Sequence, residues 1–350
     1  MKGYKKKILL LVLLIFTVAL TSCIGGPDIE DVRAKIEKAL YEKYGEEFVV
    51  DQIGTRSANG DKFYQARIYP KSIVGTNKEG DDYYYGSASV DISSFGKLGG
   101  VGDSYPLVKL KLDIENHLIP KATDIFGKRI LMSIEAHYKR REPGNVTYWG
   151  YKVSSYKEAR KLIAEDPDNR MIELELDLYI FNRIDDVQEK ERRRQEIYNF
   201  VQYLKDEGLF KFLELGVIFI DERVLAPSYQ EYSNKVYFSD KVMELIEGET
   251  VRLPPMELRK EMSKVLLYEL DEMTEKELLI SMRQIKKNQL SYDNIGKYNE
   301  QYFVWICSLD MLKINNIYLY EKYKKENKLE YYKYNTSESV LFAQDNKYIY

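Results

Sequence analysis

The stretch Met171-Ile-Glu-Leu-Glu-Leu-Asp-Leu-Tyr-Ile-Phe181 alternates apolar side chains with acidic ones. Every even-numbered residue in it is leucine or isoleucine, and acids stand between them at Glu173, Glu175 and Asp177. A period of two residues is typical of a β-strand that turns one face to a core and the other to solvent. We therefore predict a half-buried strand here, the clearest one in the chain.

Helices and strands alternate on either side of this strand. Ser155-Tyr-Lys-Glu158 has the residues of a capping box and predicts a helix that runs to about residue 164. A long helix is expected over 185–208, and the apolar run 215–220 indicates a buried strand. The order helix, strand, helix, strand predicts a mixed α/β portion over residues 146–230.

The residues before this portion predict a smaller sheet. Asp28 is placed to cap a helix that Gly45 ends. Further elements are expected in chain order: strands over 48–53, 62–69 and 83–92 with a hairpin turn at 59–61, a helix over 106–126 broken near Pro120, and a strand over 130–138. This order predicts an N-terminal α+β domain over 28–142, a small antiparallel sheet with helices on one face. The domain boundary is placed at 140–145, where charged residues precede Pro143-Gly144.

The last third, residues 231–350, is predicted to be helix-rich. A short strand is expected over 235–238. Apolar residues at helical spacing follow Pro254-Pro255, Thr274–Glu277 caps a second helix, and a third is expected over 300–323. The tail predicts a terminal hairpin from 331–334 and 340–342. The whole chain is therefore predicted to be of the α+β class.

The first 23 residues differ from the rest. A head with lysines at 2, 5, 6 and 7 precedes an apolar run over 8–20, and Leu20-Thr-Ser-Cys23 closes the segment. This is the pattern of a secretory signal, and its apolar run is shorter than the roughly 20 residues of a membrane-spanning helix. Leu20–Cys23 resembles the lipobox of bacterial lipoproteins. The resemblance implies a signal peptide over 1–22, a thioether-linked diacylglycerol and an amide-linked acyl chain on Cys23, and a spacer over 23–27.

A second resemblance concerns the residues that follow the spacer. Lys43-Tyr-Gly-Glu-Glu-Phe48 is a helix end followed by the start of a strand. It is similar to the junction in small domains of uncharacterised Gram-positive lipoproteins, over residues 28–140. Some of those lipoproteins accompany secretion or toxin–immunity loci, which implies an accessory or immunity-like role.

Charge and cysteine content narrow the class of partner. The chain has 53 basic and 56 acidic residues; removal of the signal leaves 49 against 56, a net charge of about −7. That balance argues against a nucleic-acid partner, which requires a basic surface. Cys307 is the only cysteine besides Cys23, so no intrachain disulfide is expected, and its apolar neighbours predict a buried, inert thiol.

Residues that could carry catalysis or bind a metal are few. His117 and His137 have no second histidine at helical ligand spacing. Glu135 and His137 would share one face of a strand, but zinc needs three or four ligands. No Gly-x-Ser-x-Gly motif occurs. The glycine-rich run 95–104 fits no phosphate-binding motif, so it is interpreted as a flexible connection, with a ligand-contacting loop as the alternative. We predict no catalytic residue, no metal site and no cofactor.

Two further patterns have both a structural and a functional interpretation. The charged cluster Lys190–Arg194 fits a solvated helix face, or else a patch for anionic lipids or wall polymers. The chain has 31 tyrosines, with clusters at Tyr83–Tyr85 and over 331–350. Tyrosine is common at recognition surfaces and is also an ordinary strand residue.

These observations lead to one expectation and two alternatives. The expectation is a lipoprotein, tethered to the membrane through lipid on Cys23 on the extracytoplasmic side, that binds a secreted or envelope protein without catalysis. A solute-binding lipoprotein that serves a transporter is the first alternative, and an envelope hydrolase is the second.

Overall fold

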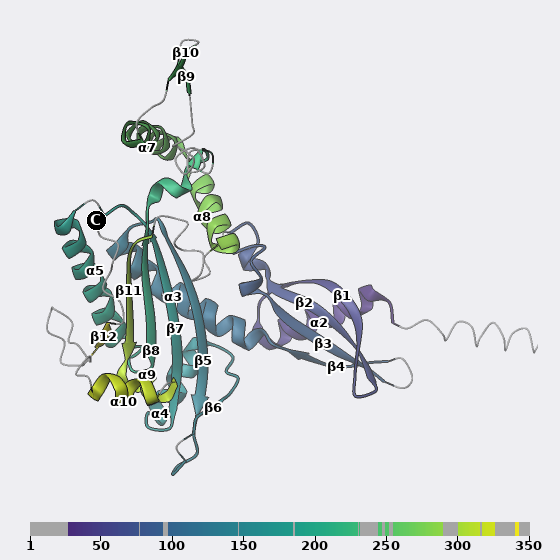
Figure 1. Ribbon diagram of the computed structural model, residues 1–350. Helices are drawn as coiled ribbons and strands as arrows, with labels where there is room; N and C mark the ends of the chain where they lie inside the picture. The colour runs from purple at the N-terminus through teal and green to yellow at the C-terminus, as the bar shows by residue number, and fades with distance from the viewer. Residues whose placement is uncertain are drawn as a thin grey trace, which may run out of the picture. The chain divides into compact units, whose positions relative to one another are not determined.

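The computed structural model divides into two compact units between Val108 and Lys109, and each unit is described by itself (Figure 1). Both units contain helices and strands, so the chain belongs to the α+β class. The structure describes residues 27–76, 78–93, 97–145, 147–184, 186–229, 231, 244–246, 249–251, 255–289, 300–315, 317–325 and 340–342. No helix among these residues is both long enough and apolar enough to cross a bilayer.

The first unit begins with helix α2, Ile29–Tyr44. The carboxylate of Asp28 accepts a hydrogen bond from the Glu30 amide, 3.3 Å away, and so caps the first turn. Gly45 ends the helix at φ 70°, in the left-handed region that favours glycine. Both predicted helix ends are confirmed.

A four-stranded antiparallel sheet follows in strand order β1-β2-β3-β4. The strands are β1 Phe48–Ala58, β2 Asp61–Pro70, β3 Gly86–Ile92 and β4 Leu98–Asp103, with short 3-10 turns η1 Lys71–Ile73 and η2 Asp82–Tyr84 between β2 and β3. Asn59 and Gly60 both have positive φ and make the tight turn between β1 and β2, as the sequence predicted.

One face of this sheet packs against α2. Val32, Ile36 and Leu40 point from the helix toward the sheet and are almost inaccessible to solvent. Alternate strand residues meet them, including Val50, Ala66, Ile68, Ala88 and Val90. The period of two in the strands and of three to four in the helix thus produces one common core.

The glycine-rich run contains a strand, so its interpretation as a flexible connection is wrong over 98–103. β4 pairs with β3, and a Cβ built on Gly99 would lie 3.1 Å from the Cβ of Asp91. Glycine therefore lets the two backbones approach closely where a larger side chain would push them apart.

Helix α3, Tyr105–Phe126, is continuous, which corrects the predicted break near Pro120. Proline removes one helical hydrogen bond, a loss that usually kinks or ends a helix. Here Leu118 and Ala122, on either side of Pro120, are both fully buried in the core of the second unit. We attribute the unbroken helix to this packing.

The second unit is built on a six-stranded mixed sheet in the order β12-β11-β8-β7-β5-β6. Its strands are β5 Ile130–Arg140, β6 Trp149–Gly150, β7 Arg170–Phe181, β8 Leu213–Ile220, β11 Glu300–Ser308 and β12 Val340–Phe342. The α-helices that the structure describes in this part include α4 Tyr156–Glu165, α5 Val187–Asp206, α7 Pro255–Glu272, α8 Glu275–Gln289, α9 Leu309–Asn315 and α10 Ile317–Lys325. A 3-10 turn, η3 Glu222–Leu225, follows β8, and β9 Glu244–Ile246 pairs with β10 Glu249–Val251.

The division between the units differs from the predicted boundary at 140–145. β5 pairs with β7 along its whole length, from Ile130 opposite Ile180 to Arg140 opposite Arg170. Residues 109–142 therefore belong to the second unit, although the sequence predicted them as part of the first. The Pro143-Gly144 break is a turn in the chain and does not separate two cores.

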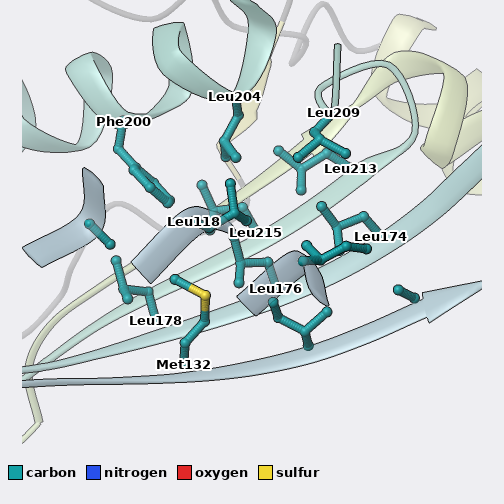
Figure 2. Packing of buried hydrophobic residues seen from close by; sticks show 14 of the residues in the cluster. Leu118, Met132, Leu174, Leu176, Leu178, Phe200, Leu204, Leu209, Leu213 and Leu215 are labelled. Atoms are coloured by element: carbon teal, nitrogen blue, oxygen red, sulfur yellow. The ribbon is translucent and has the colours of Figure 1, made fainter. Parts of the chain in front are cut away.

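The main core of the second unit lies on one face of this sheet. Side chains from α3, α4 and α5 pack onto alternate residues of β5, β7, β8 and β11. Figure 2 shows Phe200 and Leu204 of α5 above Leu174, Leu176 and Leu178 of β7. The capping box predicted for α8 is complete, because Glu277 N–H donates to Thr274 and Thr274 N–H donates to Glu277. At α4 Glu158 N–H donates to Ser155 as predicted, but the Glu158 carboxylate accepts from the preceding Ser154 and not from Ser155.

Among the residues that the structure describes, the opposite face of the sheet is covered only at its ends. At one end, side chains of η3, α7 and α8 pack on Leu131, Tyr179 and Ile218. At the other end, α9 and α10 pack beside β11 around Cys307 (Figure 1). The prediction that β7 is half-buried therefore holds only for its middle, because both faces are covered near Tyr179 and Phe181.

The prediction of a helix over 300–323 is wrong for its first part, because Glu300–Ser308 forms strand β11. Val304 and Ile306 are buried on one face of the sheet and Cys307 on the other. Because both faces are apolar here, the sequence does not alternate between polar and apolar residues. A short apolar run of this kind cannot be distinguished by periodicity from a buried helix. The predicted strand at 235–238 and the first half of the predicted tail hairpin lie outside the described residues.

Candidate functional site

Three glutamates form a row across the open middle of the second sheet. Glu135 on β5 lies opposite Glu175 on β7, and Glu175 lies opposite Glu214 on β8. Directly opposed residues of neighbouring strands have Cβ atoms about 5 Å apart and point to the same face. We name this set, together with Glu173 and Asp177 on β7, the acidic face.

Basic and aromatic side chains contact part of the acidic face. Lys111 Nζ donates to Glu135 Oε1 at 2.7 Å, and Lys139 forms an ion pair with the buried Glu173. The Trp305 indole N–H donates to Glu214 Oε1 at 2.8 Å.

Glu175 and Asp177 are less compensated, although the Tyr179 hydroxyl donates a hydrogen bond to Asp177. Both side chains are exposed, and neither forms an ion pair with any of the described residues. The acidic face therefore has five carboxylates and two lysines, with its unpaired charge at the centre.

The pKa values reflect this crowding. Burial among surrounding atoms raises the pKa of Asp177 to about 6, and the negative charges of Glu214 and Glu175 add to the effect. Burial, and then Glu214, Glu173 and Glu135, also raise the pKa of Glu175. Solvent still reaches both side chains, so it screens part of this repulsion.

Like charges on opposed strands destabilise a sheet, and carboxylates with raised pKa values gather at functional sites more often than elsewhere. The acidic face can attract a cation or accept hydrogen bonds from a basic partner. No group of three or more His, Cys, Asp or Glu side chains in the described part of the chain is arranged to hold a metal ion.

His137 lies on the same face as Glu135, as predicted, and it is exposed. The other histidine lies elsewhere: His117 Nε2 is 2.8 Å from Glu207 Oε2, which also accepts from Arg160 at 3.2 Å. The His117 ring lies 5.4 Å from that of Tyr156. The structure thus keeps the two histidines in separate environments.

Cys307 is buried beside the acidic face, opposite Glu214, which confirms the prediction of a buried thiol. Burial, and then the charge of Glu214, raise its pKa to about 12. A thiol with such a pKa stays protonated at neutral pH and is a poor nucleophile. Cys23, the predicted lipidation site, lies outside the described residues.

The cluster Lys190–Arg194 is not a uniform solvated face. Arg192 pairs with Glu189 on the surface, but Arg193 is only 3% exposed and pairs with both Glu189 and Glu196 at 2.7 Å. Its guanidinium also lies 5.6 Å from the centre of the Phe219 ring. The buried arginine therefore belongs to the packing of α5 on the sheet.

The tyrosines at 83–85 contact other residues of the first unit. Tyr84 is buried, and Tyr85 lies with its ring centre 4.6 Å from that of Tyr69. Arg67 lies 4.6 Å from the Tyr85 ring and forms two hydrogen bonds with Asp51. Most of the second cluster, over 331–350, lies outside the described residues.

The spacing of Glu135 and His137 predicted that they share a strand face, but no local pattern indicated the acidic face. The acids of β7 were evident from their alternation, whereas Glu214 is the single acid in an otherwise apolar strand. Only strand order and register bring these residues together. Comparison with protein-family models, with curated proteins and with solved structures found no match.

Proposed function

We propose that this protein is an extracytoplasmic lipoprotein, tethered to the membrane by lipid on Cys23, whose acidic face binds a basic segment of a secreted or envelope protein. The tether rests on the sequence pattern Leu20-Thr-Ser-Cys23 after a basic head and an apolar run. The binding role rests on the acidic face, and above all on the exposed Glu175 and Asp177, which form no ion pair within the described part of the chain.

Electrostatics supports a protein partner of opposite charge. Two carboxylates that repel each other in the free protein lose that repulsion when a lysine or arginine side chain lies between them. The nearby Trp305 offers an amphipathic ring, a frequent component of binding hot spots. Its indole N–H is already oriented by Glu214.

The topology favours this role over solute binding. A transporter's binding protein with two doubly wound lobes would have two parallel sheets. The first sheet is entirely antiparallel, and β7–β8 is the one parallel pair among the described strands of the second. An envelope hydrolase remains an alternative, because paired carboxylates of raised pKa also serve as acid and base.

The experiment is a pull-down of the full-length lipidated chain from solubilised membranes. We compare the wild type with Glu175→Gln/Asp177→Asn and with Asp61→Asn/Asp91→Asn, which removes two exposed acids of the first unit. We expect a stoichiometric basic protein with the wild type and the control pair, and its loss with the acidic-face pair or in high salt.

Recovery of the lipoprotein alone, or equal recovery with both double variants, would contradict the binding role. The tether is tested separately by metabolic labelling with palmitate. Label should be incorporated by the wild type and absent from Cys23→Ser.

A further inference from the structure

Helices α9 and α10 have one face that packs on the protein and one that does not. Met311, Leu312 and Tyr320 are buried around Cys307 at the end of β11. The Lys313 ammonium lies 5.1 Å from the centre of the Tyr320 ring, which links the two helices. The inner side of this helical pair is therefore fixed to the sheet of the second unit.

The outer side exposes large apolar side chains close together in sequence. Ile314 is 41% exposed, Ile317 58% and Tyr318 79%. Tyr318 is the most exposed of the large hydrophobic residues in the described part of the chain. Packing on the sheet accounts for the burial of Tyr320, whereas Ile314, Ile317 and Tyr318 remain exposed to solvent.

Positive charge surrounds this apolar group. Lys313, Lys322 and Lys325 are all exposed, and Glu321 is the exposed acid among them. The chain as a whole is acidic, with a formal net charge of −3. A locally basic helical surface therefore stands out against an acidic protein.

Isoleucine, tyrosine and lysine side by side on a helix are the components of an interfacial membrane contact. Apolar side chains enter the boundary between headgroups and acyl chains, tyrosine lies at headgroup level, and lysines attract anionic lipids. We propose that α9 and α10, through Ile314, Ile317, Tyr318 and the three lysines, dock on an anionic phospholipid surface. This inference rests on the proposed function, in which the lipid on Cys23 keeps the protein at a membrane.

Charge complementarity favours lipid over a second copy of this chain. A second copy could bring its acidic face to the lysines, but the ring beside that face, Trp305, is already hydrogen-bonded to Glu214 and offers Tyr318 no apolar layer. A membrane with anionic headgroups offers both kinds of contact in one layer. Docking would also orient the second unit, which a lipid tether at the other end of the chain cannot do alone.

The test places an environment-sensitive fluorophore at Tyr318→Cys in the full-length lipidated chain. Labelling is selective because Cys307 is buried and Cys23 would be acylated. The control position is Tyr41→Cys, an aromatic residue 57% exposed on α2 of the first unit. Each protein is reconstituted in vesicles that carry a lipid-chain quencher, either with phosphatidylglycerol or with phosphatidylcholine alone.

We expect quenching and a blue shift at position 318 in the anionic vesicles, with loss of both in neutral vesicles and in a Lys322→Glu/Lys325→Glu background. Position 41 should show neither. Equal signals at 318 in both kinds of vesicle, or equal quenching at 318 and 41, would overturn the proposal. Circular dichroism confirms that each variant is folded.

The same label in a Cys23→Ser chain separates this inference from the tether. If the tether is absent but the docking surface is real, added anionic vesicles still quench the label at 318. If the wild type is tethered and the label stays unquenched, only the docking surface is wrong.

Discussion

The two sheets of this protein differ in how far apart in the sequence their paired strands lie. In the first unit each strand pairs with the next one along the chain, so β1 to β4 form a meander. In the second unit β8 pairs with β11, which begins 80 residues after β8 ends, at Glu300 opposite Ile220. Local pairings can be read from hairpin signals, whereas distant ones depend on the packing of the whole unit.

The sheet faces that point away from the main cores differ in charge as well. In the first sheet Asp51 forms two hydrogen bonds with Arg67, at 2.7 and 2.6 Å, so the acid has its own cation. In the second sheet Glu175 and Asp177 have no ion pair among the described residues. Alternation of polar and apolar residues along a strand therefore does not show whether the acids on the polar face have cations beside them.

The largest loss of stability is expected from removal of a core side chain of the second unit. Phe200→Ala leaves a cavity under a fully buried residue and should cost about 3–5 kcal/mol. Hydrogen exchange of the full chain, followed by mass spectrometry, should show faster exchange in β7 and β8 while β1 and β2 keep their protection.

The matched control for this change is Val187→Ala on the same helix, where the side chain is 75% exposed. It should change stability by less than about 0.5 kcal/mol. Equal loss of protection in both sheets after Phe200→Ala would show that the two units unfold together.

An intermediate loss of stability is expected from a substitution at the end of helix α2 in the first unit. Gly45→Ala puts a side chain at φ 70°, which should cost about 1–2 kcal/mol. Gly100→Ala is the control, since its backbone is not left-handed and nothing lies within 4 Å of the added Cβ. Denaturant unfolding should show a lower midpoint for Gly45→Ala only. A lower midpoint in both variants would show that the left-handed backbone angle at Gly45 is not the cause.

The smallest change in stability is expected from a substitution on the acidic face, and this change depends on pH. The folded chain raises the pKa of Asp177 from 3.8 to about 6, so it holds this proton more tightly than the unfolded chain does. The contribution of Asp177 to the stability of the second unit is therefore most favourable below about pH 4 and is lost as the pH rises to about 6.

Asp177→Asn should remove this dependence. The variant should be more stable than the wild type at pH 7, by less than about 1 kcal/mol because solvent screens the exposed carboxylate. The two proteins should converge toward pH 4 in denaturant titrations at each pH. A variant less stable than the wild type at pH 7 would show that Asp177 makes favourable contacts.

Most individual elements could be predicted from the sequence because their signals are local. Asp28, Gly45 and the N-cap residues Ser155 and Thr274 all act within one turn of helix. The errors fell where local signals conflict with packing. Pro120 lies inside a helix, glycines form strand β4, and the apolar run at Val304 is a strand.

The acidic face, too, could be predicted from the sequence only in part. The sequence showed that Glu173, Glu175 and Asp177 share one face of a strand, because side chains alternate along any strand. It did not show that Glu135 and Glu214 lie beside them, since they come from strands tens of residues away in either direction.

The sequence by itself therefore determined the α+β class, most helix ends and strands, and the lipobox pattern at Cys23, which rests on residues adjacent in the chain. The tertiary structure alone decided where the two units divide, which face of the second sheet the described residues leave open, and which acids meet there. Those features depend on strand order and register, which are set when the apolar faces of distant segments are buried together.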